Sequence, residues 1–412
     1  PWATCEEVLP PLLAEMVGAK DATLEVAAMN SLTVNLHMLM AAFYRPTEGR
    51  AAIIIEAGAG DGASIPDAAF AETGATIVDD TVAALANADI VLKVQRPLIS
   101  GQDSTDEIVG MKKGAILIGM LDALQHPGDV AAWKEAGLTA FSLELLPRIT
   151  RAQSMDVLSS QSNLAGYKAV LDGTHEFSRA VPMMMTAAGT IPPARVLILG
   201  AGVAGLQAIA TARRLGAVVS AYDVRPVVKE QVESLGAKFV EVDATAIHEA
   251  ETEGGYAKEM GEDYQEKQAQ VLTEVVAKQD IVICTALIPG RPAPVLITED
   301  MVKCMRPGCV VVDLAVEQGG NCPLSEYGEV VVRHDVTIIG HANVPSRLAQ
   351  DATAMYAKNL LNFLTPLINP DTGELAIDWG DEIIKACLIT HDGAIVHPLI
   401  TDMSGEAVEV AS

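Results

Sequence analysis

Short apolar runs of strand length alternate with segments of helical periodicity through most of the chain. Helical segments repeat apolar residues every three or four positions, whereas the apolar runs are four to eight residues long, as buried strands are. In the first 150 residues, strands are predicted at 51–56, 76–78, 90–94 and 115–120, and helices at 81–88 and 129–136. This alternation is typical of α/β domains with mainly parallel sheets.

The rest of the chain continues the alternation and adds two long helices. Strands are predicted at 196–199, 217–221, 238–242, 281–284, 309–313 and 336–339, which indicates a second doubly wound sheet of about six strands. Long helices are predicted at 157–179 and from Pro345 to 367, and two further strands at 383–390 and 394–396. The expected fold is α/β, with two doubly wound, Rossmann-like domains.

The two long helices bracket the second set of strands, so the second domain is expected to be inserted in the first. The first domain is predicted to comprise residues 57–155 plus 350–412, and the nucleotide-binding domain residues 156–349. A ligand is expected in the cleft between them, at the carboxyl ends of the strands.

The most specific motif is RVLILGAGVAGLQAIATARRLGAVVSAYD, from Arg195 to Asp223. It has the GxGxxG spacing of a dinucleotide-binding turn between a strand and a helix. Gly200 permits the tight turn, Gly202 lets the backbone approach a pyrophosphate, and Gly205 lets the helix pack close to the strand. Asp223 stands where a carboxylate accepts hydrogen bonds from ribose hydroxyls. A 2′-phosphate would meet like charge there, so NAD is favoured over NADP.

Composition excludes several classes of function. A net charge of −26 over 412 residues argues against binding nucleic acid or an anionic membrane surface. The six cysteines have no paired spacing, which indicates reduced thiols and no metal site. No apolar run is long enough to span a membrane, and no secretory signal is visible, so a cytoplasmic protein is expected.

Long motifs in a fixed order resemble one family over residues 57–412. They are KVQRP (93–97), ELLPRITRAQSMDVLSSQSNLAGYKAVLDG (144–173), the glycine-rich segment (182–217), GGYAKEM (254–260), TALIPGRPAPVLI (285–297), DLAVEQGGNC (313–322), GHANVPSR (340–347) and HDGAIVHP (391–398). The chain resembles the NAD(H)-binding, membrane-peripheral alpha component of proton-translocating nicotinamide nucleotide transhydrogenase.

This resemblance implies direct hydride transfer from NADH to NADP⁺ held by a partner subunit, coupled to proton translocation. It implies NAD(H) as cofactor here and NADP(H) on the partner. It also implies membrane-spanning and NADP-binding partner subunits, a homodimer, and attachment to the inner face of the plasma membrane through those partners.

The same resemblance assigns roles to individual positions. Arg148, Gln153, Asp156 and Ser159 fall in the loop on the nicotinamide side, where Gln153 and Asp156 are expected to position the reacting ring. The other positions expected to contact NAD(H) are Gly200, Gly202, Val203, Ala204 and Gly205 at the pyrophosphate, Asp223, Val224 and Arg225 at the adenosine, and Gly255, Tyr256, Thr285, Leu287 and Asn343 in loops. His341 is interpreted as structural, and Met183–Met185 as core packing more than a dimer contact.

Transfer between two nicotinamide rings moves a hydride alone, so no catalytic acid or base is expected. The alternative is an alanine dehydrogenase-like enzyme, which resembles the same two-domain plan. That family carries a catalytic histidine where this sequence has Asp122, although Lys93 matches its substrate lysine. The balance favours transhydrogenase.

Residues 1–56 are interpreted as a foreign segment. MNSLTVNLH (29–37) resembles the phosphate-binding turn of kynureninase, with Asn30, Ser31, Leu32 and Thr33 carrying the match. Helices are expected at 5–17 and 32–43. The opening strand of the transhydrogenase family is then missing, so the first sheet is expected to lack a member and expose an edge. Under this hypothesis the chain is an NAD-binding chimera with impaired partner docking.

Overall fold

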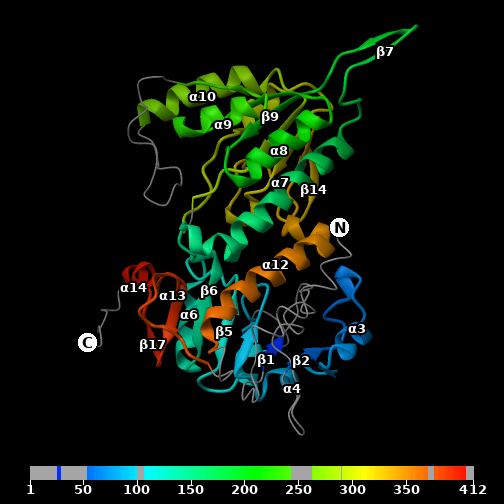
Figure 1. Cartoon of the computed structure of the whole chain (residues 1–412). Helices are drawn as coiled ribbons and strands as arrows, with labels where there is room; N and C mark the ends of the chain where they lie inside the picture. Colours follow the sequence, from blue (N-terminus) through cyan, green and yellow to red (C-terminus); the bar gives the residue numbers. More distant parts are fainter. Residues whose placement is uncertain are drawn as a thin grey trace. The chain divides into compact units, whose positions relative to one another are not determined.

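The chain folds into two compact α/β units (Figure 1). The structure is a computed structural model that describes residues 26–28, 53–99, 106–242, 262–288, 290–369 and 375–404. Unit 1 comprises residues 1–160 and 349–412, and unit 2 comprises residues 161–348. Each unit is built on its own sheet, which confirms the predicted two-domain α/β fold.

Unit 2 is built on a seven-stranded sheet with the order β11-β10-β9-β12-β13-β15-β14. Its strands are β9 (Arg195–Leu199), β10 (Val218–Tyr222), β11 (Lys238–Phe239), β12 (Ile281–Cys284), β13 (Val310–Asp313), β14 (Val330–Arg333) and β15 (Val336–Ile339). All neighbours pair in parallel except β14 with β15. The sequence prediction missed β14. From β9 the chain builds outwards to β11 on one side, then returns to β12 on the other, so the topological switch point lies between β9 and β12.

Helices cover both faces of this sheet. They are α7 (Val157–Glu176), α8 (Val203–Arg214), α9 (Lys229–Ser234), α10 (Glu262–Val276) and α11 (Glu299–Lys303), with 3-10 turns η4 (Pro226–Val228), η5 (Val316–Gln318) and η6 (Val344–Leu348). Val196 and Ile198 of β9 share one apolar core with Ala208 of α8, whereas Leu197 shares the other with Leu272 of α10. Because both faces are buried, the strand reads as a continuous apolar run.

Unit 1 is built on an eight-stranded sheet with the order β17-β16-β6-β5-β4-β1-β2-β3. Its strands are β1 (Val26–Ala28), β2 (Ile53–Glu56), β3 (Thr76–Val78), β4 (Ile90–Leu92), β5 (Ile116–Gly119), β6 (Thr139–Ser142), β16 (Leu388–His391) and β17 (Ala394–Ile395). Its helices are α3 (Asp67–Glu72), α4 (Thr81–Leu85), α5 (Glu107–Gly110), α6 (Pro127–Glu135), α12 (Ala349–Leu364), α13 (Glu382–Cys387) and α14 (Pro398–Ser404), with η1 (Asp61–Ala63), η2 (Leu143–Leu145), η3 (Thr150–Met155) and η7 (Thr365–Leu367).

The expectation that the first sheet lacks a member is wrong. β1 lies between β2 and β4 and pairs in parallel with both, so the N-terminal segment supplies a central strand. A gap there would leave the facing backbone groups of β2 and β4 without partners, which is costly in a buried sheet. Three residues are too short to give a periodic signal in the sequence. The helices expected at 5–17 and 32–43 lie outside the described residues.

The strand predicted at 383–390 is also partly wrong, because its first half is helix α13. The carboxylate of Asp381 caps this helix and accepts a hydrogen bond of 2.8 Å from the backbone N–H of Ile383. Ile383, Ile384 and Cys387 are buried, a helical spacing that a short apolar run does not distinguish from a strand. Strand β16 begins only at Leu388.

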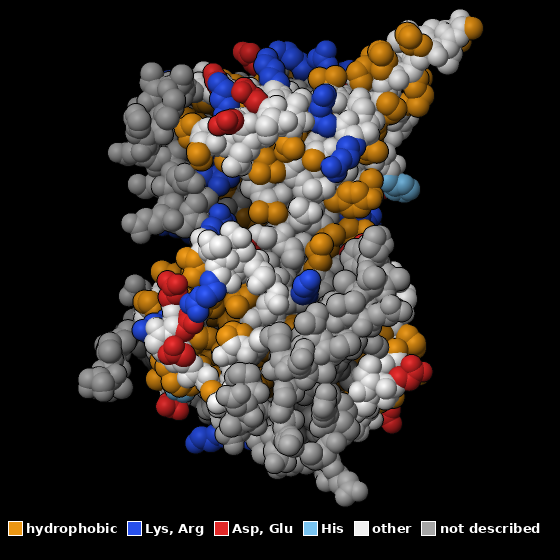
Figure 2. All heavy atoms as spheres, viewed as in Figure 1, with side chains coloured by type: hydrophobic (Ala, Val, Ile, Leu, Met, Phe, Trp, Pro, Cys, Tyr) orange, Lys and Arg blue, Asp and Glu red, His pale blue; other side chains and the backbone are white. Residues whose placement is uncertain are grey.

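A two-stranded antiparallel hairpin, β7 (Met184–Thr186) with β8 (Gly189–Ile191), projects from unit 2 (Figure 1). Met183, Met184 and Met185 are 59%, 45% and 75% exposed, so the expectation that they pack in the core is wrong. Hydrophobic side chains extend along the projecting hairpin in Figure 2. Across the described part of the chain, no helix has the length and apolar character needed to cross a membrane.

The position of β1 can be tested with Ala27→Pro. Proline removes a backbone N–H from the central strand and leaves a carbonyl without its donor, at a cost of about 1–3 kcal/mol. We expect faster hydrogen exchange in β2 and β4, measured by mass spectrometry. Thr76→Pro, at the first residue of the edge strand β3, where proline is better tolerated, is the control. Unchanged protection of β2 and β4 in Ala27→Pro would contradict the pairing.

Candidate nucleotide-binding site

The turn between β9 and α8 admits only glycine at two positions. Gly200 has a φ of +97°, and a Cβ there would lie 2.7 Å from Oγ1 of Thr285. At Gly205 a Cβ would lie 1.9 Å from the carbonyl oxygen of Gly200. Both distances are shorter than a side chain tolerates, so α8 begins in direct contact with the end of β9. These contacts explain the first and third glycines of the motif.

Gly202 has a different role, because a Cβ there would meet no atom within 4 Å. It is the N-cap residue of α8, and within the described residues no side chain caps this end of the helix. The first N–H groups of a helix have no partner within it and attract anions. Val203, the first residue of α8, is exposed. Open space therefore adjoins a helix terminus suited to a phosphate group.

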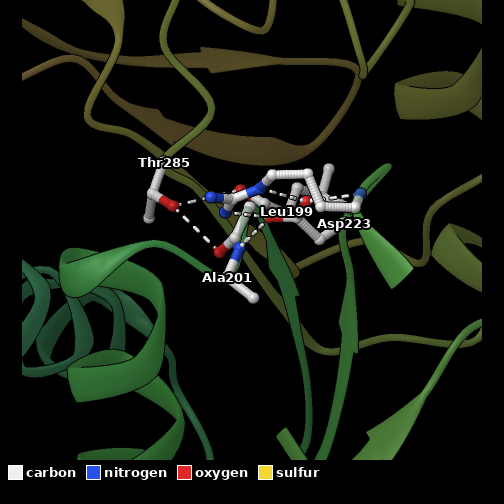
Figure 3. A network of polar contacts seen from close by, with 6 residues as sticks. Leu199, Ala201, Asp223 and Thr285 are labelled. Carbon is white, nitrogen blue, oxygen red and sulfur yellow. Dashed lines mark hydrogen bonds and ion pairs between the residues drawn. The ribbon is translucent and has the colours of Figure 1, made fainter. Parts of the chain in front are cut away.

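Asp223 lies directly after β10 and is 8% exposed. Its Oδ2 accepts a hydrogen bond of 2.7 Å from the backbone N–H of Ala201, which ties the carboxylate to the glycine turn (Figure 3). Arg225 donates to the same carboxylate from its backbone N–H at 2.8 Å and from Nε and Nη2 at 2.9 Å. The carboxylate is thus in place for ribose hydroxyls, but they would have to replace or share the Arg225 side chain.

Thr285 joins the end of β12 to the glycine turn. Its hydroxyl donates to the carbonyl oxygen of Gly200 at 3.0 Å and lies 3.3 Å from that of Leu199 (Figure 3). The neighbouring strand ends are therefore bridged at the switch point. Leu287, two residues further on, is partly exposed.

Asn343 follows β15 and has a φ of +43°, a conformation that asparagine tolerates better than most residues. Its backbone N–H donates to Oε1 of Glu317 at 2.8 Å. For His341, two residues before it, burial is the first cause that lowers the pKa, with the positive charge of Arg347 the second. A neutral ring suits the structural role predicted for this histidine.

The four predicted nicotinamide-side residues lie around η3 and the start of α7. The carboxylate of Asp156 accepts a hydrogen bond of 2.9 Å from the backbone N–H of Ser159 and a second from its hydroxyl. This is the geometry of a helix cap, so Asp156 and Ser159 form one unit. Arg148 and Gln153 are exposed.

Sequence reasoning missed two residues that hold η3 in place. Asn359 and Asn362 of α12 donate from Nδ2 to the carbonyl oxygen of Ser154 at 2.9 and 2.8 Å. The hydroxyl of Ser160 donates to Oδ1 of Asn359 at 2.7 Å. The only signal in the sequence is the helical spacing of the two asparagines, which does not reveal their partner.

The structure groups the predicted contacts into two sets. Gly200–Gly205, Asp223–Arg225 and Thr285 come together at the carboxyl edge of the unit 2 sheet, with Asn343 after the end of β15. Arg148, Gln153, Asp156 and Ser159 belong to unit 1. Gly255 and Tyr256 lie outside the described residues. That these residues contact nucleotide stays a prediction.

The residues that bear on the alanine dehydrogenase alternative lie in unit 1. Lys93 is 1% exposed, and its ammonium group is 2.7 Å from Oε1 of Glu107, so the lysine is committed to a buried ion pair. Asp122 has a φ of +50°, and its Oδ2 lies 3.4 Å from Nε2 of His126. Burial raises the pKa of Asp122, and the charges of His126 and Arg96 oppose that rise.

Comparison with protein families identifies the chain. The model described as alanine dehydrogenase/PNT, C-terminal domain, matches residues 169–398, and the N-terminal domain model matches residues 47–165. The chain belongs to the alanine dehydrogenase/PNT family. It is 60% identical over 349 residues to an NAD(P) transhydrogenase subunit alpha chain of Rhodospirillum rubrum, covering 85% of this chain and 91% of that one.

Within this family the transhydrogenase branch is nearer than the dehydrogenase branch. Alanine dehydrogenase of Mycobacterium tuberculosis is 28% identical over 368 residues, covering 87% of this chain and 91% of that one. The crystal structure of transhydrogenase from Sinorhizobium meliloti matches with a TM-score of 0.74 and 47% identity, over 91% of this chain and 99% of that one. The resemblance to transhydrogenase is confirmed, and alanine dehydrogenase is a distant relative.

The kynureninase interpretation of residues 1–56 is not borne out. The family match begins at residue 47, inside the segment interpreted as foreign, and β1 completes the sheet of unit 1. The resemblance rested on a short stretch in which Ser31 and Thr33 suit a helix start. Such residues are common at helix starts in unrelated proteins.

The glycine turn can be tested with a pair of substitutions. Gly205→Ala forces a Cβ against the Gly200 carbonyl, so we expect a loss of about 1–3 kcal/mol of stability and of NADH binding. Gly202→Ala meets open space and should leave the thermal midpoint nearly unchanged, while its methyl group obstructs the phosphate approach. Calorimetry and NADH fluorescence titration measure both properties. Normal NADH affinity in Gly202→Ala would place the diphosphate elsewhere.

Proposed function

We propose that this chain is the NAD(H)-binding subunit of an NAD(P) transhydrogenase. It binds NADH and passes hydride directly to NADP⁺ held by a partner subunit. Membrane-spanning partner subunits couple this transfer to proton translocation. The observation that carries the proposal is the glycine turn beside the uncapped end of α8, with the Asp223 carboxylate bonded to that turn.

The chemistry of the proposed reaction suits the residues of the η3 loop. Hydride transfer between nicotinamide rings needs two C4 atoms about 3–3.5 Å apart in a water-poor site, and it needs no proton donor. In our proposal Gln153 and Asp156 position the nicotinamide. Asp156 already holds the start of α7 through Ser159, a role that requires a fixed carboxylate.

The comparisons support this proposal over alanine dehydrogenase. The relatives named transhydrogenase are 60% and 44% identical to the chain over nearly equal lengths, against 28% for alanine dehydrogenase. Lys93, the residue that matched the dehydrogenase substrate lysine, is buried against Glu107 and is therefore poorly placed to bind a substrate.

The partner subunits follow from the names of the relatives. Those of Rhodospirillum rubrum and Rickettsia prowazekii are named subunit alpha, and the chain covers 65% of the longer subunit alpha of Cereibacter sphaeroides. A chain named as one subunit implies that others complete the enzyme. We propose that these are an NADP(H)-binding subunit and a membrane-spanning subunit. Through them the chain would attach to the inner face of the plasma membrane.

We also propose that the chain acts as a homodimer through the β7–β8 hairpin. An isolated two-stranded hairpin is marginally stable in water, and exposed apolar side chains on one element mark an interaction surface. Met183–Met185 and Ile191 are all exposed on this hairpin. A second copy of the chain would cover them.

Asp223 provides a test of cofactor choice. Asp223→Asn removes the charge that opposes a 2′-phosphate and weakens the grip on the ribose. NADH affinity should fall about ten- to a hundredfold, while discrimination against NADPH narrows. Fluorescence titration with both nucleotides measures the change. Asp300→Asn, at an exposed carboxylate of the same unit, is the control.

The reaction itself can be tested with the NADP-loaded partner subunit and thio-NADP⁺, whose reduced form absorbs apart from NADH. We expect NADH-dependent reduction of thio-NADP⁺ only when both components are present. Pyruvate with ammonium should oxidise no NADH. Turnover of pyruvate would transfer the function to the alanine dehydrogenase branch.

The dimer can be tested with Met185→Asp, which places a charge in the middle of the hairpin. Light scattering after size exclusion should give twice the chain mass for the wild type and the monomer mass for the variant. Val332→Asp, at an exposed apolar position of the edge strand β14, should remain dimeric. A monomeric wild type, or a dimeric Met185→Asp, argues against the hairpin interface.

A further inference from the structure

A hydrogen-bonded support extends behind the glycine turn, and it starts from the buried carboxylate of Asp313. This residue ends β13 and is 1% exposed. Its Oδ1 accepts from the backbone N–H of Ala315 at 3.0 Å and of Asn321 at 3.2 Å. Its Oδ2 accepts from the backbone N–H of Cys322 at 3.0 Å and the hydroxyl of Ser325 at 2.8 Å. Four donors therefore fix the loop that follows β13.

Gly320 shows how tightly this loop closes on the carboxylate. It has a φ of +80°, and a Cβ there would lie 2.8 Å from Oδ2 of Asp313. The loop can fold over the carboxylate only because no side chain intervenes. This folding places the next residue, Asn321, fully buried beside the end of β12.

Asn321 then pairs with the backbone beyond β12 as a neighbouring strand would. Its Oδ1 accepts from the N–H of Ala286 at 3.1 Å, and its Nδ2 donates to the carbonyl oxygen of Ala286 at 2.9 Å. Nδ2 also donates to the carbonyl oxygen of Pro294 at 2.8 Å. β12 and β13 pair in register only as far as Cys284 and Asp313. The amide side chain continues the pairing after the strands end.

The loop that Asn321 holds is the one that contacts the glycine turn. Thr285 precedes Ala286, and its hydroxyl donates to the carbonyl oxygen of Gly200 at 3.0 Å. We propose that Asn321 is a positioning residue for the dinucleotide diphosphate, acting through Ala286 and Thr285 on the turn at Gly200. The inference rests on the proposed function, because it assumes that this turn receives NAD(H).

The chemistry predicts which ligands depend on Asn321. Removing its amide leaves buried N–H and C=O groups of Ala286 without partners, so the loop relaxes to find others. The glycine turn then loses the Thr285 bond, which weakens contacts to the diphosphate. The adenosine end depends on Asp223, which is held by Ala201 and Arg225 and not by Asn321.

The test compares NADH with adenosine on the full chain. In Asn321→Ala and Asn321→Asp we expect the NADH dissociation constant to rise about tenfold, and that of adenosine, measured by displacement of NADH, to change less than about twofold. Aspartate keeps the size and the acceptor but loses both N–H donors. Gln279→Ala is the matched control, since this buried amide donates to Val275 at the opposite end of β12. It should leave both affinities within about twofold.

A second set of variants keeps the test independent of folding at Asn321. Thr285→Val removes the hydroxyl and should weaken NADH as Asn321→Ala does, whereas Thr285→Ser should restore affinity. If the two residues act in one chain, Asn321→Ala with Thr285→Val should weaken NADH by less than the product of the single effects.

Three outcomes would overturn the positioning role. They are unchanged NADH affinity in Asn321→Ala, an equal loss of adenosine affinity, and independent effects in the double variant. If the wild type does not bind NADH at all, the proposed function fails first. The wild-type titration therefore separates the two failures.

Discussion

The start of α8 in contact with the end of β9 is the constraint on which the candidate site depends. Gly205 faces the carbonyl oxygen of Gly200 at a distance that no side chain allows, and Gly166 of α7 similarly faces the carbonyl oxygen of Ala204. Two helices therefore meet at one turn through glycines. This close packing brings the backbone N–H groups of the helix terminus to the sheet edge. A larger residue at Gly205 would push the terminus away from the switch point.

The two edges of the unit 2 sheet use their buried carboxylates differently. At the amino edge, Asp280 is held by Arg179 at 3.3 Å, Arg306 at 2.6 Å and the backbone N–H of Arg195 at 2.8 Å. At the carboxyl edge, the four donors that hold Asp313 are three backbone N–H groups and one hydroxyl, all of them neutral. The amino edge is closed by ion pairs that stabilise the fold. The carboxyl edge is organised by hydrogen bonds that shape loops, as an open α/β sheet requires where ligands bind.

Unit 1 illustrates how a short strand can escape a sequence pattern and still be central. β1 has only three residues, but it pairs with β2 and β4 along its whole length. The sheet therefore continues from β4 to β2 without a break. The same unit holds η3 through Asn359 and Asn362, so the loop proposed to position the nicotinamide rests on a helix about two hundred residues away in sequence.

The sequence alone determined the two-domain α/β fold, the strands at 76–78, 281–284 and 336–339, and the glycine turn with Asp223. Each of these depends on local properties: apolar periodicity, or a backbone conformation that only glycine adopts. Only the tertiary structure decided that 382–387 is helical, that β1 fills the first sheet, that Arg225 shares the Asp223 carboxylate, and that Asn321 supports the turn. These features depend on which residues of distant segments come within hydrogen-bonding distance. Strand order and register set those distances, and neither is encoded in the spacing of residues along the chain.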